Sequence, residues 1–395
     1  MKTKTGRYVL IEQFLADGMD YMFGNPGTVE QGFLDVLSEY PRMKYILTLQ
    51  ESVAVMMADG YARAVKKPAL VQIHSTPGLG NAVGALYQAM RGHSPLVVIG
   101  GDAGIKYLPM DAQMAGDLVA MAKPVTKWSV MVQDSASLLR TIRRAVKIAA
   151  TPPMGPVYVC LPADILDQPA VESVYPASIP TTRVIPERFA LEQAAEWLAG
   201  AENPMIFIGD GVAYSGAQEE TARVAEQLGA EVWGVDSGEL NISYNHPLYQ
   251  GQTGHMFGFG SYSATSKGDV NLIVGTYMVP EVFPRLDDIY ASGAKTIHID
   301  LNAYEIAKNH PVDLGMVSDP RATLSALGGV LEGMMTSGQK KAALERKEKL
   351  AAEKEKKRAA QIDADSKNPS VKTLFMKVLS EKLPADAVIF DNRHP

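Results

Sequence analysis

The chain has 395 residues, 46% of them hydrophobic and 21% charged, and its formal net charge is −6. Because ordinary domains contain about 100–150 residues, this length predicts two or three domains. The acidic balance argues against a nucleic-acid surface, and the lack of any run of about 18 apolar residues in the sequence argues against a membrane-spanning helix.

The first predicted domain, residues 1–165, alternates short apolar runs with helix-like patterns, which is typical of βαβ units and a parallel sheet. We predict strands at 45–49, 69–73, 96–99 and 157–159, and helices at 29–40, 51–65 and 80–90. The single cysteine, Cys160, lies in an apolar run, and we interpret it as a buried structural thiol. One cysteine and an N-terminus without an apolar signal stretch favour a cytoplasmic protein.

Four further segments follow this domain. Residues 166–188 are rich in Pro, Ser and Thr and indicate a linker. Residues 189–335 predict a second α/β domain, and 336–368 predict a charged helical connector supported by oppositely charged neighbours. Residues 369–395 predict a helix over 371–379 and a strand over 387–391, the start of a third α/β domain. The predicted fold class is therefore α/β, with two parallel-sheet, three-layer domains plus the stub of a third.

The elements predicted within the second domain are helices at 191–199 and 217–228 and strands at 205–208, 231–235, 271–274 and 295–299.

Three residues that can carry chemistry follow predicted strands or begin predicted helices of the first domain: Thr28, Glu51 and His74. In an open parallel sheet, ligands bind outside the carboxyl ends of the strands, so these side chains could converge on one cleft. Each also has an ordinary structural explanation. Glu51 could stabilise the dipole at the start of a helix, and Thr28 could be the N-cap of a helix. His74 could be a structural residue whose hydrogen bonds are made within the fold.

A glycine pair in the same domain raises a different possibility. Gly78 and Gly80 follow a predicted strand and open a helix, as in a dinucleotide fingerprint, but the third glycine is at 84 instead of 83. A nicotinamide oxidoreductase therefore stays an alternative with weak support.

Several motifs together resemble the pyrimidine-binding domain of thiamine-diphosphate-dependent enzymes. They are Gly24-Asn25-Pro26-Gly27-Thr28, Leu49-Gln50-Glu51, Ala58-Asp59-Gly60-Tyr61-Ala62, His74-Ser75, Gly78-Leu79-Gly80-Asn81 and Gly92-His93-Ser94-Pro95-Leu96. The resemblance is to benzoylformate decarboxylase first and the acetolactate-synthase group next. At the level of domains it extends over residues 7–335.

The resemblance implies roles for the residues that match. Glu51 would hydrogen-bond N1′ of the cofactor's aminopyrimidine, and His74 would transfer protons to or from the intermediate or product. Thr28 replaces a Ser that contacts the substrate carboxylate in the family. The pyrimidine side would be lined by three neighbouring residues, Asn25, Pro26 and Gly27. The implied substrate is a small 2-keto acid, and the implied assembly is a homodimer or homotetramer.

Two departures from the family pattern matter. The stretch 275–282 holds no His where benzoylformate decarboxylase has a second catalytic one, and His255 is the candidate substitute. The family binds Mg²⁺ and the cofactor's diphosphate through Gly-Asp-Gly and a later Asn in a third domain. Here Gly209-Asp210-Gly211 lacks an Asn at the right spacing, so we predict no metal ligand in this chain and interpret the chain as truncated at its C-terminal side.

Three readings follow for function. The first is a 2-keto-acid decarboxylase whose Mg²⁺ and diphosphate site lies elsewhere, so that this chain alone is inactive. The second is acetolactate-synthase-like carboligation. The third is a non-catalytic half-site protein that pairs with a separate diphosphate-domain chain.

Overall fold

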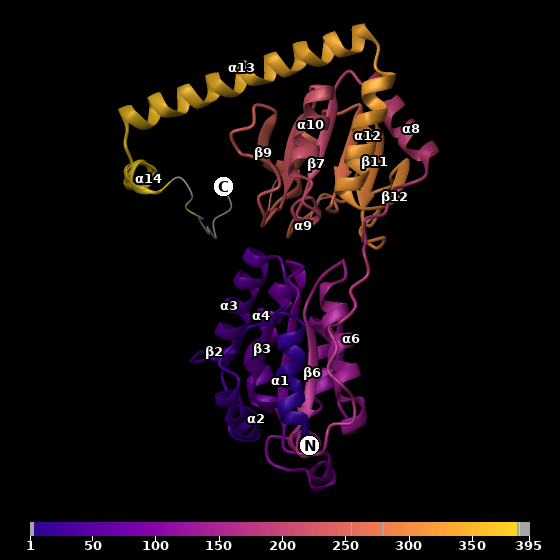
Figure 1. Ribbon diagram of the computed structural model, residues 1–395. Helices are drawn as coiled ribbons and strands as arrows, with labels where there is room; N and C mark the ends of the chain where they lie inside the picture. Colours follow the sequence, from indigo (N-terminus) through magenta and orange to yellow (C-terminus); the bar gives the residue numbers. More distant parts are fainter. Residues whose placement is uncertain (1–3, 254, 279, 385–386, 388–395) are drawn as a thin grey trace. The chain divides into compact units, whose positions relative to one another are not determined.

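The computed structural model describes residues 4–253, 255–278, 280–384 and 387, and the chain divides into two compact units, Met1–Thr182 and Arg183–Pro395 (Figure 1). Within the described residues, no helix is both long and apolar enough to cross a membrane. The strand predicted at 387–391 lies outside the described residues except for Ala387, which is not in a strand.

The first unit is built on a six-stranded, all-parallel sheet with the order β2-β1-β3-β4-β6-β5. Its strands are β1 (Tyr21–Gly24), β2 (Lys44–Leu47), β3 (Ala69–Ile73), β4 (Leu96–Asp102), β5 (Trp128–Met131) and β6 (Val157–Pro162). The chain leaves β1 toward one edge and returns at β3, so a topological switch point lies between these two strands. Ligands of open α/β sheets bind at the carboxyl ends of the strands at such a point.

Helices cover both faces of this sheet. They are α1 (Gly6–Ala16), α2 (Gln31–Val36), α3 (Glu51–Val65), α4 (Ser75–Arg91), α5 (Leu118–Ala122), α6 (Leu138–Ala150) and α7 (Ala163–Leu166). Short 3-10 turns complete them: η1 (Thr28–Glu30), η2 (Leu37–Glu39), η3 (Ile105–Met110), η4 (Lys123–Val125) and η5 (Ser135–Ser137). Two separate apolar clusters result, with α1, α2 and α6 on one face and α3, α4 and α5 on the other.

Helix α4 begins earlier than the sequence pattern indicates. We predicted a helix from Gly80, but the helix begins at Ser75, directly after the strand and His74. Pro77 is tolerated there because it lies in the first turn, where its missing N–H would have no partner inside the helix. The prediction was wrong because it took the Pro and Gly residues as loop signals.

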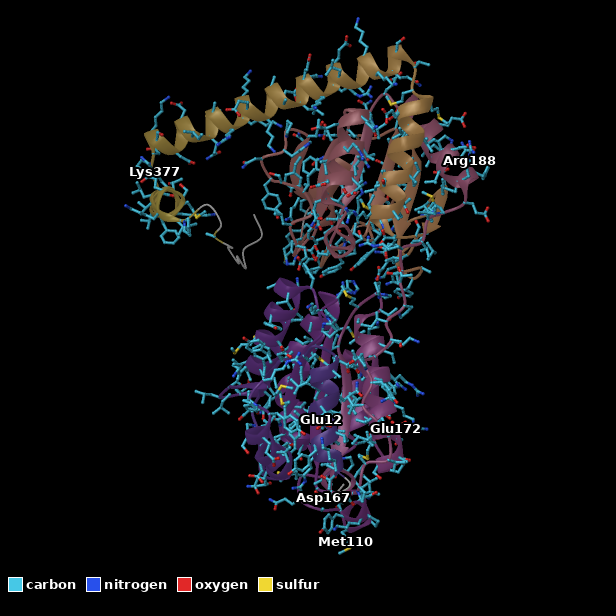
Figure 2. The ribbon with its side chains drawn as sticks, in the orientation of Figure 1. Glu12, Met110, Asp167, Glu172, Arg188 and Lys377 are labelled. Atoms are coloured by element: carbon cyan, nitrogen blue, oxygen red, sulfur yellow. The ribbon has the colours of Figure 1, made fainter. Side chains whose placement is uncertain are left out.

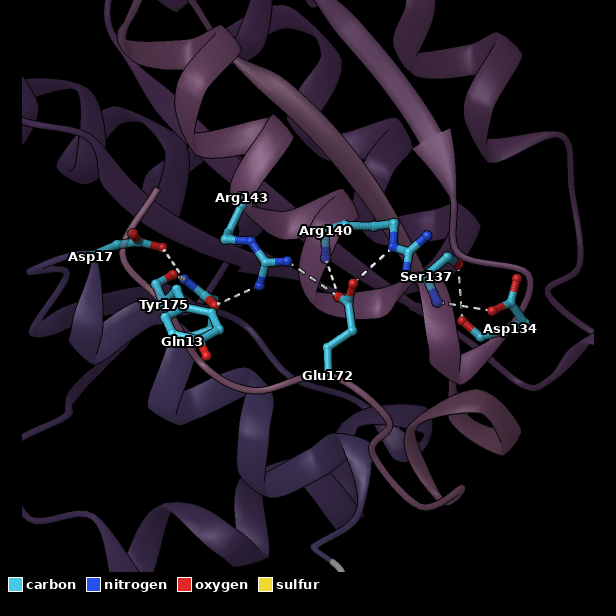
Figure 3. Close-up of polar contacts among 8 residues, drawn as sticks. All are labelled: Gln13, Asp17, Asp134, Ser137, Arg140, Arg143, Glu172 and Tyr175. Carbon is cyan, nitrogen blue, oxygen red and sulfur yellow. Dashed lines mark hydrogen bonds and ion pairs between the residues drawn. The ribbon is translucent and has the colours of Figure 1, made fainter. Parts of the chain in front are cut away.

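The segment predicted as a linker, 166–188, is divided between the two units. Its first part packs on the first unit through Glu172, which accepts hydrogen bonds from the Arg140 guanidinium at 2.8 Å and pairs with Arg143 at 3.4 Å (Figure 3). Nearby, the side chain of Gln13 donates to the Tyr175 carbonyl at 2.7 Å (Figure 3). Residues 167–182 are therefore a docked strap, and the unit boundary falls after Thr182.

The second unit repeats the architecture with a six-stranded parallel sheet in the order β12-β11-β10-β7-β8-β9. Its strands are β7 (Pro204–Ile208), β8 (Glu231–Val235), β9 (Tyr249–Thr253), β10 (Val270–Val274), β11 (Lys295–Asp300) and β12 (Leu314–Val317). Its helices are α8 (Arg188–Gly200), α9 (Gly211–Ser215), α10 (Gln218–Leu228), α11 (Gly258–Thr265), α12 (Pro320–Met334), α13 (Ser337–Lys367) and α14 (Val371–Lys382). The predicted fold class, parallel sheets in three-layer units, is confirmed for both units.

Helix α13 is the predicted charged connector, and its first half is docked on the second unit. Ala343 is its one buried residue. The Lys354 ammonium donates to three backbone carbonyls at 2.7 Å each, those of Tyr244, His246 and Tyr249. Most other side chains of α13 are exposed (Figure 2). Hydrogen bonds from a lysine to backbone carbonyls therefore hold this helix on the unit, since it buries little apolar surface.

Candidate functional site

The candidate site lies at the carboxyl edge of the first sheet, around the switch point between β1 and β3. β1 ends at Gly24 and leads through 25–27 into η1, whereas β3 ends at Ile73 and leads through His74 into α4. Because β1 and β3 are hydrogen-bonded neighbours, the residues that follow them are brought together. Glu30 and His74 meet in this way.

The two side chains form a carboxylate–imidazole pair in which Glu30 is buried and His74 is half-buried. His74 Nδ1 lies 2.8 Å from Glu30 Oε2. The Glu30 carboxylate also accepts the Gly27 N–H at 2.9 Å and the Gly101 N–H at 3.1 Å, and its residue is 4% exposed. Burial raises the pKa of Glu30, and these three donors oppose the rise.

Glycine at position 27 is required by the ring of His74. A Cβ added to Gly27 would lie 2.3 Å from the His74 Cε1 and Nδ1 atoms, so the imidazole packs directly on the bare backbone. The ring is thus confined between this backbone and the Glu30 carboxylate.

Glu51 lies where the sequence predicts it, at the first residue of α3, and it is 6% exposed. The side chain of Gln50 caps this helix by accepting the Ser52 N–H at 2.8 Å. The Glu51 carboxylate turns toward the start of α4. Its Oε2 accepts the Asn81 amide at 2.9 Å, and a Cβ added to Gly78 would lie 2.9 Å from its Oε1.

Glu51 and His74 therefore contact the same end of one helix. His74 is the N-cap residue of α4, and Gly78, beside the Glu51 carboxylate, is one turn further along and donates its N–H to the His74 carbonyl at 2.7 Å. Among the described residues, Asn81 is the one side chain hydrogen-bonded to the Glu51 carboxylate, and Oε1 is left to accept from a ligand. This arrangement fits a polar ring that donates a hydrogen bond.

The remaining residues predicted for the site lie beside this pair. Asn25 and Pro26 are half-buried in the loop after β1, and Thr28 begins η1 with an exposed side chain. Two hollows of about 10 Å³ lie at this edge of the sheet, one lined by Glu30 and the other by Val29, Ser75 and Asp102, and each has room for about one water molecule. Neither could hold a pyrimidine ring.

Sequence reasoning missed Glu30 and did not single out Asn81. Glu30 stands in the first turn of a helical segment, where an acidic residue has an ordinary explanation in the helix dipole. Its position beside His74 follows from the pairing of β1 with β3, which the sequence does not show. Asn81 was quoted in a motif, but the late predicted start of α4 hid its place on the helix.

Cys160 and His93 both have structural roles. Cys160 is fully buried in β6, as predicted, and burial raises the pKa of its thiol, which leaves it a poor nucleophile. His93 has its Nδ1 3.3 Å from the Met154 carbonyl, a structural contact.

In the second unit, the Gly209-Asp210-Gly211 segment follows β7, and its carboxylate binds the chain itself. Asp210 accepts the Gly238 N–H at 3.1 Å, the Glu239 N–H at 3.0 Å and the Asn241 amide at 3.2 Å. His255 pairs with Asp236 at 3.0 Å in the same unit. No group of three His, Cys, Asp or Glu side chains in the described part of the chain is placed to hold a metal ion.

The second unit also buries two titratable groups at its sheet. Burial raises the pKa of Asp300 to about 7 and lowers that of His298 to about 4. His298 Nε2 lies 2.7 Å from the Thr276 carbonyl, and its Nδ1 accepts the Ala307 N–H at 3.4 Å. The neutral imidazole satisfies both contacts, with its proton on Nε2.

Taken together, the first unit is an α/β module that brings ionisable side chains together at the switch point of a parallel sheet, where ligands of such folds bind. Two family models match the chain: the N-terminal binding domain of thiamine pyrophosphate enzymes over residues 4–121, and the central domain of the same enzymes over residues 191–327. The chain belongs to the thiamine pyrophosphate enzyme family.

Individual relatives agree with this assignment. A probable acetolactate synthase large subunit from Methanococcus aeolicus is 31% identical over 327 residues, covering 81% of this chain and 54% of that protein. A benzoylformate decarboxylase from Pseudomonas aeruginosa is 30% identical over 317 residues, covering 78% of this chain and 59% of that protein. The chain therefore spans between half and three-fifths of the length of these relatives.

A solved structure shares the fold. The thiamine diphosphate-dependent 4-hydroxybenzoylformate decarboxylase of Rhodococcus jostii RHA1 superposes with a TM-score of 0.75 at 27% identity, covering 84% of this chain and 62% of that one.

Proposed function

We propose that the first unit is the pyrimidine-binding half of the active site of a thiamine-diphosphate-dependent 2-keto-acid decarboxylase similar to benzoylformate decarboxylase. The observation that supports this most is the buried Glu51 carboxylate, held by Asn81 against the bare backbone of Gly78, one helical turn from His74. A carboxylate in this setting can hold a hydrogen bond to a ring nitrogen away from bulk water.

Each residue of the site would have its own role in the reaction. Glu51 Oε1 would bind the protonated ring nitrogen of the aminopyrimidine, and Asn81 would keep the carboxylate in place. Bound thiamine diphosphate would supply an electron sink for the carbon–carbon bond that is broken. His74 would exchange a proton with the intermediate or product, and the Thr28 hydroxyl would bind the substrate carboxylate.

The metal and diphosphate would be held by groups outside the described residues. Asp210, the acidic residue of the Gly-Asp-Gly segment, already accepts three hydrogen bonds from its own unit. We therefore propose that this chain by itself binds thiamine diphosphate and Mg²⁺ weakly and does not decarboxylate 2-keto acids.

Isothermal titration of the chain with thiamine diphosphate and Mg²⁺ tests this. We expect a weak heat that is further reduced by Glu51→Gln. Tight stoichiometric binding would contradict the half-site, and binding unaffected by Glu51→Gln would contradict the assignment of Glu51.

Carboligation is the second candidate, because acetolactate synthases stand beside a benzoylformate decarboxylase among the relatives. Product analysis separates the two reactions, since decarboxylation yields an aldehyde and CO2, whereas carboligation of two 2-keto acids releases one CO2 and yields a 2-hydroxyketone that keeps the carboxylate of the second acid. The assay needs an assembly that turns over. If this chain is inactive and a separate chain restores activity, the half-site reading is favoured.

We further propose that the face beside Glu51 is a subunit interface in a homodimer or a higher assembly of two dimers. It exposes five large apolar residues on or next to α3 and α4: Leu49, Val53, Met56, Met57 and Tyr87. Leu49 is 95% exposed, and a Cβ on Gly84 of α4 would meet open space, so exposed apolar side chains lie on the helix that begins at Glu51 and on its neighbour. A second copy on this face would cover the surface beside Glu51.

Sedimentation velocity tests the interface. We expect the chain to sediment as a dimer or larger, and Met56→Glu to shift it toward monomer. A monomeric wild type would refute the proposal. The exposed Met110 in the first unit provides the control substitution, Met110→Glu, which should leave the assembly unchanged.

A further inference from the structure

The buried pair at the switch point suggests a role for Glu30 that neither the sequence motifs nor the family assignment provides. We propose that Glu30 is a positioning residue that fixes the proton of neutral His74 on Nδ1 and thereby leaves Nε2 as the basic atom at the site. The inference rests on the proposed function, because it refines the role of His74 as the proton-transfer group.

The hydrogen-bond pattern of Glu30 supports this assignment. Each carboxylate oxygen accepts a backbone N–H, Oε2 from Gly27 at 2.9 Å and Oε1 from Gly101 at 3.1 Å. Burial raises the pKa of Glu30, but these two N–H donors oppose the rise and favour the ionised carboxylate, which can only accept hydrogen bonds. His74 Nδ1, 2.8 Å from Oε2, must therefore be the donor of the bond between them. The proton of the neutral ring then sits on Nδ1, and Nε2 keeps its lone pair.

The packing of the ring keeps it from turning over. Gly27 lies against the ring, and the His74 side chain is 18% exposed. With Nδ1 held by the carboxylate, Nε2 is the ring nitrogen that is left without this partner. A histidine without this partner could carry its proton on either nitrogen, and the Nε2–H form cannot accept a proton at Nε2.

Other ionisable groups surround Glu30. Tyr45, Tyr158, Cys160 and Asp102 are close enough to interact with it or with one another electrostatically. Tyr45 donates its hydroxyl to Gln72 and Asp102 accepts the Gly104 N–H at 3.1 Å. None of these groups replaces Glu30 as the acceptor at Nδ1.

The test is ¹⁵N NMR of the chain labelled at histidine, with His74 assigned by the loss of its signals in His74→Gln. At a pH where the ring is neutral, we expect the shifts of a protonated Nδ1 and a bare Nε2. Glu30→Met removes the acceptor and should convert His74 to the Nε2–H form. Glu30→Gln keeps an acceptor oxygen and should retain the Nδ1–H form.

A wild-type Nε2–H tautomer, or an unchanged tautomer in Glu30→Met, would overturn the proposal. The wild-type spectrum decides even where a variant does not fold. The exposed carboxylate of Glu39 gives the matched control, Glu39→Gln, which should leave the His74 signals unchanged. The tautomer is measured without ligand, so failure of this inference is distinguishable from failure of the proposed function, which the titration with thiamine diphosphate reports.

Discussion

Replacing Asp300 with Asn should stabilise the second unit, and it should do so most at high pH. Asp300 ends β11, and its Oδ1 accepts the Asn302 N–H at 2.6 Å. Burial, with a smaller contribution from Glu305, raises the pKa of Asp300 from 3.8 to about 7. Asn has nearly the same shape and keeps an oxygen for Asn302, so Asp300→Asn removes the charge while retaining the contact.

The size and sign follow from linkage. Between pH 3.8 and about 7 the folded chain holds a proton on Asp300 that the unfolded chain has released. Stability therefore falls as pH rises through this window, and the full loss is present above it. A pKa raised by about 3 corresponds to about 4 kcal/mol. Of this, about 3 kcal/mol develops between pH 5 and pH 8.

Urea unfolding of wild type and Asp300→Asn, followed by tryptophan fluorescence at about pH 5 and about pH 8, measures the effect. We expect the variant's advantage to be about 3 kcal/mol larger at the higher pH. Burial lowers the pKa of His298 from 6.5 to about 4, so its contribution to stability rises with pH between these two values. Both proteins contain His298, so this contribution cancels in the difference between them. An advantage that does not depend on pH, or a variant less stable at high pH, would refute the reasoning.

Three further substitutions test the contacts of the first unit. Gly27→Ala places a Cβ 2.3 Å from the ring of His74, so we expect it to displace the ring and cost about 1–3 kcal/mol in urea unfolding. Gly78→Ala places a Cβ 2.9 Å from Glu51 Oε1 and should weaken thiamine diphosphate binding in the titration described above. Glu172→Ala removes the acceptor of two arginines and should speed proteolytic cleavage within 167–182.

Gly60→Ala in the same unit is the control for the glycine substitutions. Gly60→Ala adds a Cβ that meets nothing within 4 Å, so it should not lower stability. If Gly27→Ala were as stable as Gly60→Ala, the packing of the His74 ring on the backbone would be wrong. Unchanged cofactor binding in Gly78→Ala would show that Glu51 does not face the ligand, and unchanged cleavage of Glu172→Ala would show that the strap is held elsewhere.

Much of the fold could be predicted because its strands are buried on both faces. The strand at 69–73 reads as a continuous apolar run, and the helix at 51–65 shows a regular amphipathic pattern; both were predicted with the bounds that the structure has. The strands at Tyr21–Gly24 and Trp128–Met131 were missed, since they are four residues long and have no alternation to detect.

The site was predictable only in part. Glu51 and His74 could be singled out because each follows a strand, but their convergence on one end of α4 depends on the strand order, which no local pattern contains. Glu30 was missed for the same reason, since its partners His74 and Gly101 are brought to it by neighbouring strands. Long-range pairing of this kind is visible in the sheet and not in the residue spacing.

The central claim is that the edge of the first unit at Glu51 binds the aminopyrimidine of thiamine diphosphate. Amide chemical-shift mapping of the ¹⁵N-labelled chain, titrated with thiamine diphosphate and Mg²⁺ to millimolar concentration, tests it most directly. We expect saturable shifts at the amides of 24–30 except Pro26, of 50–52, and of 74–81 except Pro77, and we expect Glu51→Gln to reduce them. Shifts confined to the second unit, or none at these positions, would contradict it.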